Sequence, residues 1–320
     1  MPLHPALADR LSLLDGIPSF EAGFADPAMR ARMDAFFLPP APPTTVDVDA
    51  RDDELPGPHG PIGVRVYTPR DPATAARPAL VWLHGGGFRM GDLNMPEADG
   101  VARRICAAAG AAVVSVDYRL ANGGTHYPVP LDDVVAATAG VRENAGRMGI
   151  DPARITLGGA SAGGNLAAGA ALRLRDELGW QPAGLVLVYP VAHAVIPPPS
   201  RALAAELQAL PRMLRFLPDD VDSITRNYLG AAPSAAGGYA MPANAILDGL
   251  CPVVVVNAEY DDLRTSGEAF TAALAVVGVD VRQVLVRGHL HGFLNYGAEY
   301  DEVRAVLDLM AETVGRAGRR

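Results

Sequence analysis

The stretch that decides the fold is ITLGGASAGGNLA at residues 155–167. The apolar run Ile155–Leu157 predicts a buried strand, and the alanine-rich segment Gly163–Leu178 that follows predicts a helix. Ser161 lies in the turn between them, flanked by small residues that let the chain reverse sharply. Such a turn holds its serine hydroxyl above the sheet, at the N-terminus of the helix. The stretch therefore predicts a reactive Ser161, and the alternative is a glycine-rich turn in which the serine is incidental.

Apolar runs of the same kind recur on both sides of this stretch. They are Ala79–Leu83, Ala112–Val116, Leu185–Val188, Val253–Val256 and Val281–Val286. Alanine-rich segments of helical length, such as Glu97–Ala109 and Leu131–Asn144, lie between them. Runs that are apolar on both faces and alternate with helices are typical of parallel strands. We expect an α/β fold with a mostly parallel central sheet and helices on both faces.

Two segments depart from this alternation. Residues 1–45 contain a helix candidate, Pro27–Leu38, followed by the turn-rich stretch LPPAPPTT at 38–45. Residues 194–247 contain three consecutive prolines and two helix candidates, Ser200–Ala209 and Asp219–Tyr228. An insertion of that size usually covers the carboxyl edge of a sheet. The body of the fold is then divided into residues 46–193, which begin with an antiparallel strand pair, and residues 248–320. The expected pair is Val46–Arg51 with Ile62–Tyr67.

Composition excludes several classes of protein. The chain has 320 residues, of which 49% are hydrophobic and 20% charged, so it is not disordered. Its net charge of −9 repels phosphate backbones, and we expect no nucleic-acid partner. Cys106 and Cys251 are too few for a disulfide framework and are expected to be buried. The N-terminus lacks a signal-peptide pattern and no apolar run has membrane-spanning length, so we expect a cytoplasmic protein without a membrane partner.

A second motif, HGGGF at residues 84–88, directly follows the expected strand Ala79–Leu83. Three consecutive glycines leave backbone N–H groups unobstructed, as an oxyanion hole requires. A phosphate cradle is the competing use of such a loop. The chain contains neither G-x-G-x-x-G nor a P-loop, so the motif favours oxyanion binding.

The third signal is spread along the chain. Asp261 follows the strand Val253–Val256, and His291 follows the strand Val281–Val286. Serine, aspartate and histidine therefore occur in the order of an α/β-hydrolase triad, each after a parallel strand. His289 and His291 also form an H-x-H pair, but no nearby cysteine or H-E-x-x-H helix supports a metal site, and we expect none. His289 is instead expected to line or support the pocket.

Together these motifs resemble the hormone-sensitive-lipase-like family of bacterial carboxylesterases, which have the α/β-hydrolase fold. The resemblance runs from about residue 64 to the C-terminus and includes HGGGF (84–88), VDYRLA (116–121), YPVPLDDV (127–134), GGASAGGNLA (158–167), AEYD (258–261) and HGF (291–293). It implies Ser161 as nucleophile, His291 as general base and acid, and Asp261 as its orienting carboxylate. Gly85, Gly86 and Ala162 would supply the oxyanion N–H groups. The family also implies a helical cap built from residues 1–45 and 194–247, and it requires no cofactor.

The chain departs from the family pattern at three places near the site. Ala160 replaces the usual aspartate or threonine, a glycine-rich loop occupies residues 121–126, and Asp262 stands where the family has proline. Because a position that accepts proline is a turn position, we expect Asp262 to be an exposed carboxylate of little consequence. Candidate pocket residues share an apolar or aromatic side chain near the motifs or in the insertion. They are Phe88, Met213, Leu214, Leu217 and His289.

The resulting hypothesis is a serine carboxylesterase that hydrolyses short- to medium-chain esters of small molecules through an acyl-enzyme. An amide, lactone or N-formyl hydrolase with the same triad is the alternative from the same chemistry. A non-catalytic ligand receptor on the same fold is the alternative from another class, but such receptors usually lack a triad residue. The protein is expected to be a monomer or a homodimer.

Overall fold

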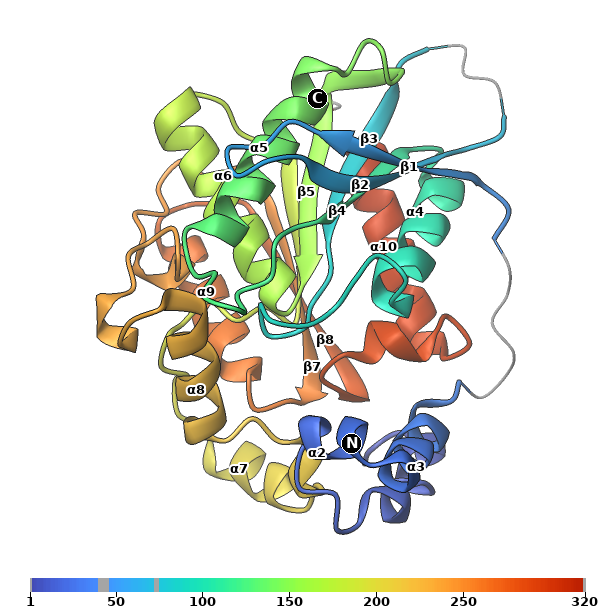
Figure 1. The fold of residues 1–320 in the computed structure, drawn as a ribbon, viewed down its shortest axis with the longest axis vertical. Helices are drawn as coiled ribbons and strands as arrows, with labels where there is room; N and C mark the ends of the chain where they lie inside the picture. Colours follow the sequence, from blue (N-terminus) through green and yellow to red (C-terminus); the bar gives the residue numbers. More distant parts are fainter. Residues whose placement is uncertain (1, 40–45, 72–74, 319–320) are drawn as a thin grey trace.

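The structure is a computed structural model that describes residues 2–39, 46–71 and 75–318. The strands of the described residues form one eight-stranded sheet in the order β1-β2-β4-β3-β5-β6-β7-β8 (Figure 1). They are β1 (Asp49–Leu55), β2 (Ile62–Thr68), β3 (Arg77–Leu83), β4 (Ala112–Asp117), β5 (Ile150–Ala160), β6 (Gly184–Val188), β7 (Val253–Tyr260) and β8 (Val281–Leu290). Strand β2 is antiparallel to both β1 and β4, and every later neighbour pair is parallel. The expected mostly parallel sheet and its antiparallel first pair are confirmed.

Helices cover both faces of the sheet (Figure 1). One face carries α5 (Val129–Glu143), α6 (Ala162–Leu178) and α9 (Arg264–Val276), and the other carries α4 (Val101–Ala109) and α10 (Asp301–Arg316). Each helical layer encloses a hydrophobic core against the sheet: the first core lies under α5, α6 and α9, and the second under α4 and α10. Along β3, Val81 and Leu83 pack into the first core, whereas Leu80 and Trp82 pack into the second. Since successive side chains of a strand point to opposite faces, a strand between two helical layers is apolar at every position.

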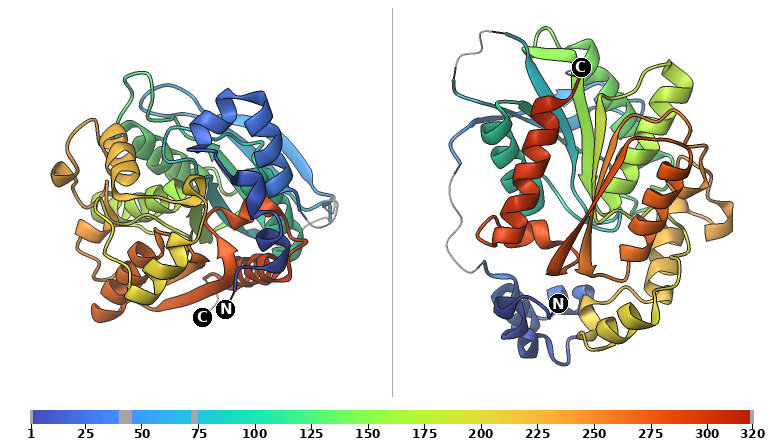
Figure 2. Two further views of the ribbon diagram at one scale, coloured as in Figure 1. Left: turned by 90° about the horizontal axis from the view of Figure 1, so that it is seen from below. Right: turned by 180° about the vertical axis from the view of Figure 1, so that it is seen from behind.

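The N-terminal segment and the insertion lie together beneath the carboxyl ends of β7 and β8 (Figures 1 and 2). The N-terminal helices are α1 (Pro5–Ala8), α2 (Phe20–Ala25) and α3 (Pro27–Phe37), and the insertion contains α7 (Arg201–Gln208) and α8 (Pro218–Leu229). The described residues also contain six short helical turns: η1 (Leu11–Leu14), η2 (Pro96–Gly100), η3 (Arg212–Leu214), η4 (Pro233–Ala235), η5 (Pro242–Asn244) and η6 (Phe293–Tyr296). Leu7 and Leu207, from the two segments, belong to one buried cluster. The turn-rich stretch 38–45 lies mostly outside the described residues.

Side-chain caps explain where the insertion begins its first helix. The Ser200 hydroxyl accepts a hydrogen bond from the Leu203 backbone amide at 3.2 Å, so Ser200 caps α7, close to the start of the predicted helix Ser200–Ala209. Among the helices of the described residues, none is both long enough and apolar enough to cross a membrane. Cys106 and Cys251 are buried free thiols, and burial raises the pKa of each to about 12.

Candidate active site

The register of the parallel strands places the candidate triad at one edge of the sheet. Ala160, the last residue of β5, pairs with Val188 at the end of β6. Tyr260, the last residue of β7, pairs with Leu290 at the end of β8. The next residues along β5, β7 and β8 are Ser161, Asp261 and His291. Loops that leave the carboxyl ends of parallel strands meet at that edge, which is where the insertion lies.

The three side chains form one hydrogen-bonded chain. His291 Nε2 lies 2.9 Å from Ser161 Oγ, and His291 Nδ1 lies 2.7 Å from Asp261 Oδ2. Asp261 is 1% exposed, whereas Ser161 retains 9% exposure and the His291 side chain 14%. Asp261 Oδ1 also accepts the Leu263 amide at 2.8 Å, which fixes the carboxylate. The carboxylate is therefore the buried end of this series of hydrogen bonds, and the serine is the end that keeps exposed surface.

The hydrogen bonds define the state of the imidazole. A carboxylate can only accept, so Nδ1 carries the proton and Nε2 accepts the Ser161 hydroxyl. Burial by itself lowers the pKa of His291, but the charge and hydrogen bond of Asp261 outweigh it and hold the pKa above its ordinary value. A raised pKa makes Nε2 a better proton acceptor from the serine.

Ser161 sits on a strained backbone turn. Its φ of 55° and ψ of −116° lie outside the conformations that a side-chain-bearing residue readily adopts. Two residues later the turn passes so close to β3 that a Cβ at Gly163 would overlap the carbonyl oxygens of Leu83 and His84. The small residues of the motif are therefore required by the close contact between turn and strand, as the sequence predicted.

The glycine loop differs from the expected oxyanion set at one position. The Gly85 N–H donates to Glu97 Oε1 at 2.6 Å, so this donor is already used and the assignment of Gly85 is wrong. The neighbouring N–H groups of Gly86 and Gly87, and that of Ala162 at the start of α6, make no hydrogen bond to protein within the described ranges. Gly86 has a φ of 117°, and a Cβ there would collide with the Met90 carbonyl, which explains the glycine.

Glu97, on η2, is a site residue that the motifs did not reveal. Its carboxylate is 2% exposed and accepts hydrogen bonds from three parts of the chain. Besides the bond from the Gly85 backbone N–H to Oε1, Oε2 accepts hydrogen bonds from the Tyr189 hydroxyl at 2.8 Å and from the Asn295 side-chain Nδ2 at 3.1 Å. Burial and the Glu97 charge raise the pKa of Tyr189 well above its usual value, so its hydroxyl stays a donor. One buried carboxylate thus joins the glycine loop to the loop that carries His291.

Two aromatic rings contact the imidazole. Tyr189, after β6, lies with its centroid 4.8 Å from that of His291, and Phe216 of the insertion meets His291 edge-on at 4.9 Å. Phe216 is one of the apolar residues of the insertion that, by sequence, could line an acyl pocket, although it is not among the five candidate pocket residues. A half-buried aromatic residue amid leucines gives no signal of what it touches.

The expected pocket residues are buried or half-buried. Phe88 is buried and stacks on Tyr228 of α8 at 3.9 Å. Met213 and Leu214 are buried in the second core, and Leu217 is half-buried where α8 begins. His289 has no exposed surface and packs on His4 and Tyr300, with Glu302 3.4 Å from its Nε2. A side chain without accessible surface cannot line an open pocket, so Phe88, Met213 and His289 are better described as supports.

The expectation that Asp262 is an exposed turn carboxylate is wrong. Its side chain is only 14% exposed and pairs with Arg215 through two contacts, at 2.8 and 2.9 Å. Oδ2 also accepts the Phe216 amide at 2.8 Å. The Asp262–Arg215 pair could not be predicted from the sequence, because the two residues are 47 positions apart, one on the body and one in the insertion.

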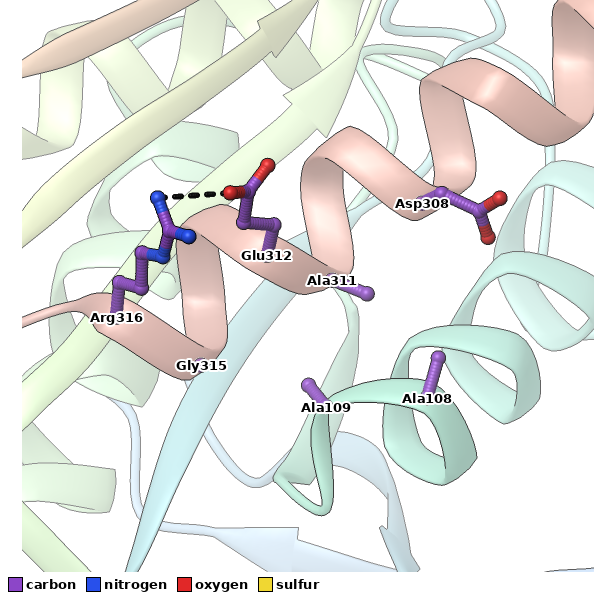
Figure 3. Close-up of a pocket in the computed structure, with 7 residues that line it drawn as sticks. All are labelled: Ala108, Ala109, Asp308, Ala311, Glu312, Gly315 and Arg316. Atoms are coloured by element: carbon purple, nitrogen blue, oxygen red, sulfur yellow. Dashed lines mark ion pairs between the residues drawn. The ribbon is translucent and has the colours of Figure 1, made fainter.

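A depression of about 400 Å³ lies elsewhere, between α4 and α10 (Figure 3). It is lined by Ala108, Ala109, Asp308, Ala311, Glu312, Gly315 and Arg316. Ala109 precedes β4, so the depression lies at the amino ends of the strands, opposite the edge that carries Ser161. None of these residues is a nucleophile, and Arg316 and Glu312 pair with each other at 2.7 Å.

Comparisons with known proteins agree with this fold and site. The profile of a family described as alpha/beta hydrolase fold matches residues 80–295. Esterase LipI of Mycobacterium tuberculosis is 36% identical over 295 residues, 89% of this chain and 87% of that protein. Carboxylesterase NlhH of the same organism is 35% identical over 310 residues, 95% and 91% of the two chains. A solved hyperthermophilic esterase from the archaeon Pyrobaculum calidifontis has a TM-score of 0.81 at 32% identity over 98% of both chains. This chain belongs to the α/β-hydrolase fold family.

Proposed function

We propose that this protein is a serine carboxylesterase that hydrolyses short- to medium-chain esters, with Ser161, His291 and Asp261 as its catalytic triad. The observation that carries the proposal is the continuous hydrogen-bonded chain from the Asp261 carboxylate through His291 to the Ser161 hydroxyl. The relatives that bear the names esterase and carboxylesterase support the same activity. The protein is an ester hydrolase.

The mechanism follows from the state of each group. Ser161 Oγ attacks the ester carbonyl carbon while its proton passes to His291 Nε2, and the Asp261 carboxylate stabilises the imidazolium formed. The carbonyl oxygen becomes an oxyanion and accepts hydrogen bonds from the N–H groups of Gly86, Gly87 and Ala162. The imidazolium then protonates the leaving alcohol, which departs from the acyl-enzyme. Water repeats the attack with His291 as base, and releases the acid and the free serine.

The N-terminal segment and the insertion supply the substrate's surroundings in this proposal. Both lie over the edge that carries Ser161, and we propose that residues 1–45 and 194–247 act as a cap. Helix α8 is joined to the body by the 121–126 loop: Asn227 Nδ2 donates to the Ala121 carbonyl at 2.5 Å, and His126 Nδ1 lies 2.7 Å from the Asn227 carbonyl. In this proposal the cap restricts the space over Ser161, which favours short acyl groups and a soluble small-molecule ester.

The test is a panel of p-nitrophenyl esters from acetate to palmitate, together with the matched p-nitroanilide of butyrate, a γ-lactone and emulsified triolein. We expect the highest kcat/KM between acetate and hexanoate, and much slower turnover of the anilide and the lactone. Faster turnover of the anilide or the lactone would assign the same triad to amide or lactone hydrolysis. Faster turnover of emulsified triolein than of soluble butyrate esters would contradict the short-chain preference.

A further inference from the structure

The carboxylate next to the triad aspartate holds the insertion to the body. Asp262 faces the Arg215 guanidinium in a two-point pair, the geometry in which such pairs are strongest and most directional. Arg215 Nη1 also donates to the Leu207 carbonyl at 2.7 Å, at the end of α7. Both charged side chains are largely buried, so water cannot fully replace either partner if the other is removed.

The same carboxylate fixes the residue that follows Arg215. Its Oδ2 accepts the Phe216 amide at 2.8 Å, so the backbone of Phe216 is held directly against the loop that follows β7. From there the Phe216 ring meets the His291 imidazole edge-on, with centroids 4.9 Å apart. Because His291 is hydrogen-bonded to Ser161, an acyl group attached to Ser161 lies within reach of that ring.

We propose that Asp262 and Arg215 form a clamp that positions Phe216 against His291 and thereby limits the length of the acyl group that the site accepts. This inference rests on the ester hydrolysis proposed above. Asp262 and Arg215 are positioning residues, because they touch Phe216 and not the reacting atoms. Phe216 itself restricts the acyl group, and its ring also limits how far the imidazole can turn away from Ser161.

The Asp262–Arg215 pair also has an electrostatic effect on the His291 imidazole. The titratable and charged groups around the imidazole are Asp261, Asp262, Glu97, Tyr189, Tyr296 and Arg215. The negative charge of Asp262 contributes to raising the pKa of His291, and Arg215 neutralises part of that charge. Removing the carboxylate therefore lowers the pKa of His291, whereas removing the guanidinium raises it.

The experiment compares Asp262→Asn, Arg215→Met, the double variant and Phe216→Leu by kcat and KM on p-nitrophenyl butyrate and decanoate. For each single variant we expect the decanoate-to-butyrate ratio of kcat/KM to rise about fivefold or more, chiefly through KM for decanoate. The double variant should shift the ratio no further than either single variant, since each one already opens the clamp. The acid limb of kcat/KM should move to lower pH in Asp262→Asn, to higher pH in Arg215→Met, and stay in place in Phe216→Leu.

The matched control is Asp222→Asn, which removes an exposed carboxylate paired with Arg226 on α8 of the same insertion. It should leave the ratio within about twofold of wild type. Ratios within about twofold for both Asp262→Asn and Arg215→Met would overturn the clamp and leave the pair as an anchor only. If Asp262→Asn does not fold, Phe216→Leu and Arg215→Lys decide the matter in the same way. A wild-type protein inactive on every ester would instead overturn the proposed function.

Discussion

His291 is the residue through which most of the site acts. It receives the serine hydroxyl on Nε2 and donates to Asp261 from Nδ1, and the rings of Tyr189 and Phe216 hold it on two sides. The contribution of Asp261 is thus to proton affinity and tautomer, and the contribution of the two rings is to orientation alone. Each can be tested separately, because the carboxylate changes the pKa and the rings do not.

The first prediction concerns the pH dependence of this imidazole. His291 must be neutral to accept the serine proton, so kcat/KM falls as the pH drops through its pKa. Because that pKa is raised above its ordinary value of 6.5, the acid limb of wild type should lie above pH 6.5. Asp261→Asn removes the charge that raises it, so the limb should move to lower pH. We also expect kcat to fall at least about a hundredfold, since the tautomer is no longer fixed.

The measurement is kcat/KM for p-nitrophenyl butyrate across the neutral range for both proteins, with circular dichroism as the check on folding. An Asp261→Asn variant with full kcat and an unmoved acid limb would show that another group orients His291.

The second prediction concerns Glu97. Glu97→Gln keeps the size of the side chain but replaces one acceptor oxygen with a donor, which cannot serve both the Gly85 amide and the donors from Tyr189 and Asn295. The glycine loop should then shift, and kcat should fall about tenfold to a hundredfold with little change in KM. Asp92→Asn, an exposed carboxylate on the same loop, is the control. Equal kcat values for the two variants would remove Glu97 from the support of the oxyanion loop.

Sequence motifs located the triad residues but not their supports, for a physical reason. Ser161, Asp261 and His291 each follow within a few residues of an apolar run, so the local pattern places them at the same edge of the sheet. Glu97 has no such signal, because its partner Asn295 is 198 residues away. The family resemblance implies Gly85 and Gly86 as oxyanion donors, and the motif itself shows three glycines in a row. Only the contact with Glu97 distinguishes the first from the other two.

At the scale of elements, the site depends on the close approach of β3, β5 and α6. The turn at Ser161 packs against the end of β3, and this contact brings the glycine loop beside the nucleophile.

Strand bounds were predicted less well than strand identity: β5 begins at Ile150 and β8 ends at Leu290, beyond the apolar runs. Backbone pairing continues beyond the apolar runs, as between Tyr260 and Leu290, and hydrophobic pattern alone does not show where that pairing stops.

The third prediction tests this contact. Gly163→Ala places a methyl group against the Leu83 and His84 carbonyl oxygens, neither of which can move without displacing β3. We expect a loss of about 3 kcal/mol in the free energy of unfolding. Gly140→Ala in α5 is the matched control, since its Cβ would meet only Leu55 at ordinary contact distance. It should stabilise the protein by about 0.5–1 kcal/mol. Urea unfolding of both variants measures this, and equal midpoints would contradict the account of the turn.

At the scale of the whole molecule, the chain places two segments distant in sequence over one edge of a sheet (Figure 2). Helical periodicity predicted α3, α7 and α8, and the break in strand alternation predicted the insertion. How the insertion attaches could not be predicted, since the Asp262–Arg215 pair and the 121–126 contacts join residues that no local pattern links. The division into cap and body, the cytoplasmic location and the choice between monomer and homodimer stay predictions.

The measurement that tests the central claim most directly is kcat of Ser161→Ala on p-nitrophenyl butyrate, with folding checked by circular dichroism. Alanine removes the nucleophile and leaves the oxyanion donors and the imidazole in place. We predict a folded variant whose kcat is lower by at least about a thousandfold, the remainder coming from the oxyanion hole and binding. A folded variant that keeps more than about a tenth of wild-type kcat would contradict the assignment of Ser161 as the nucleophile.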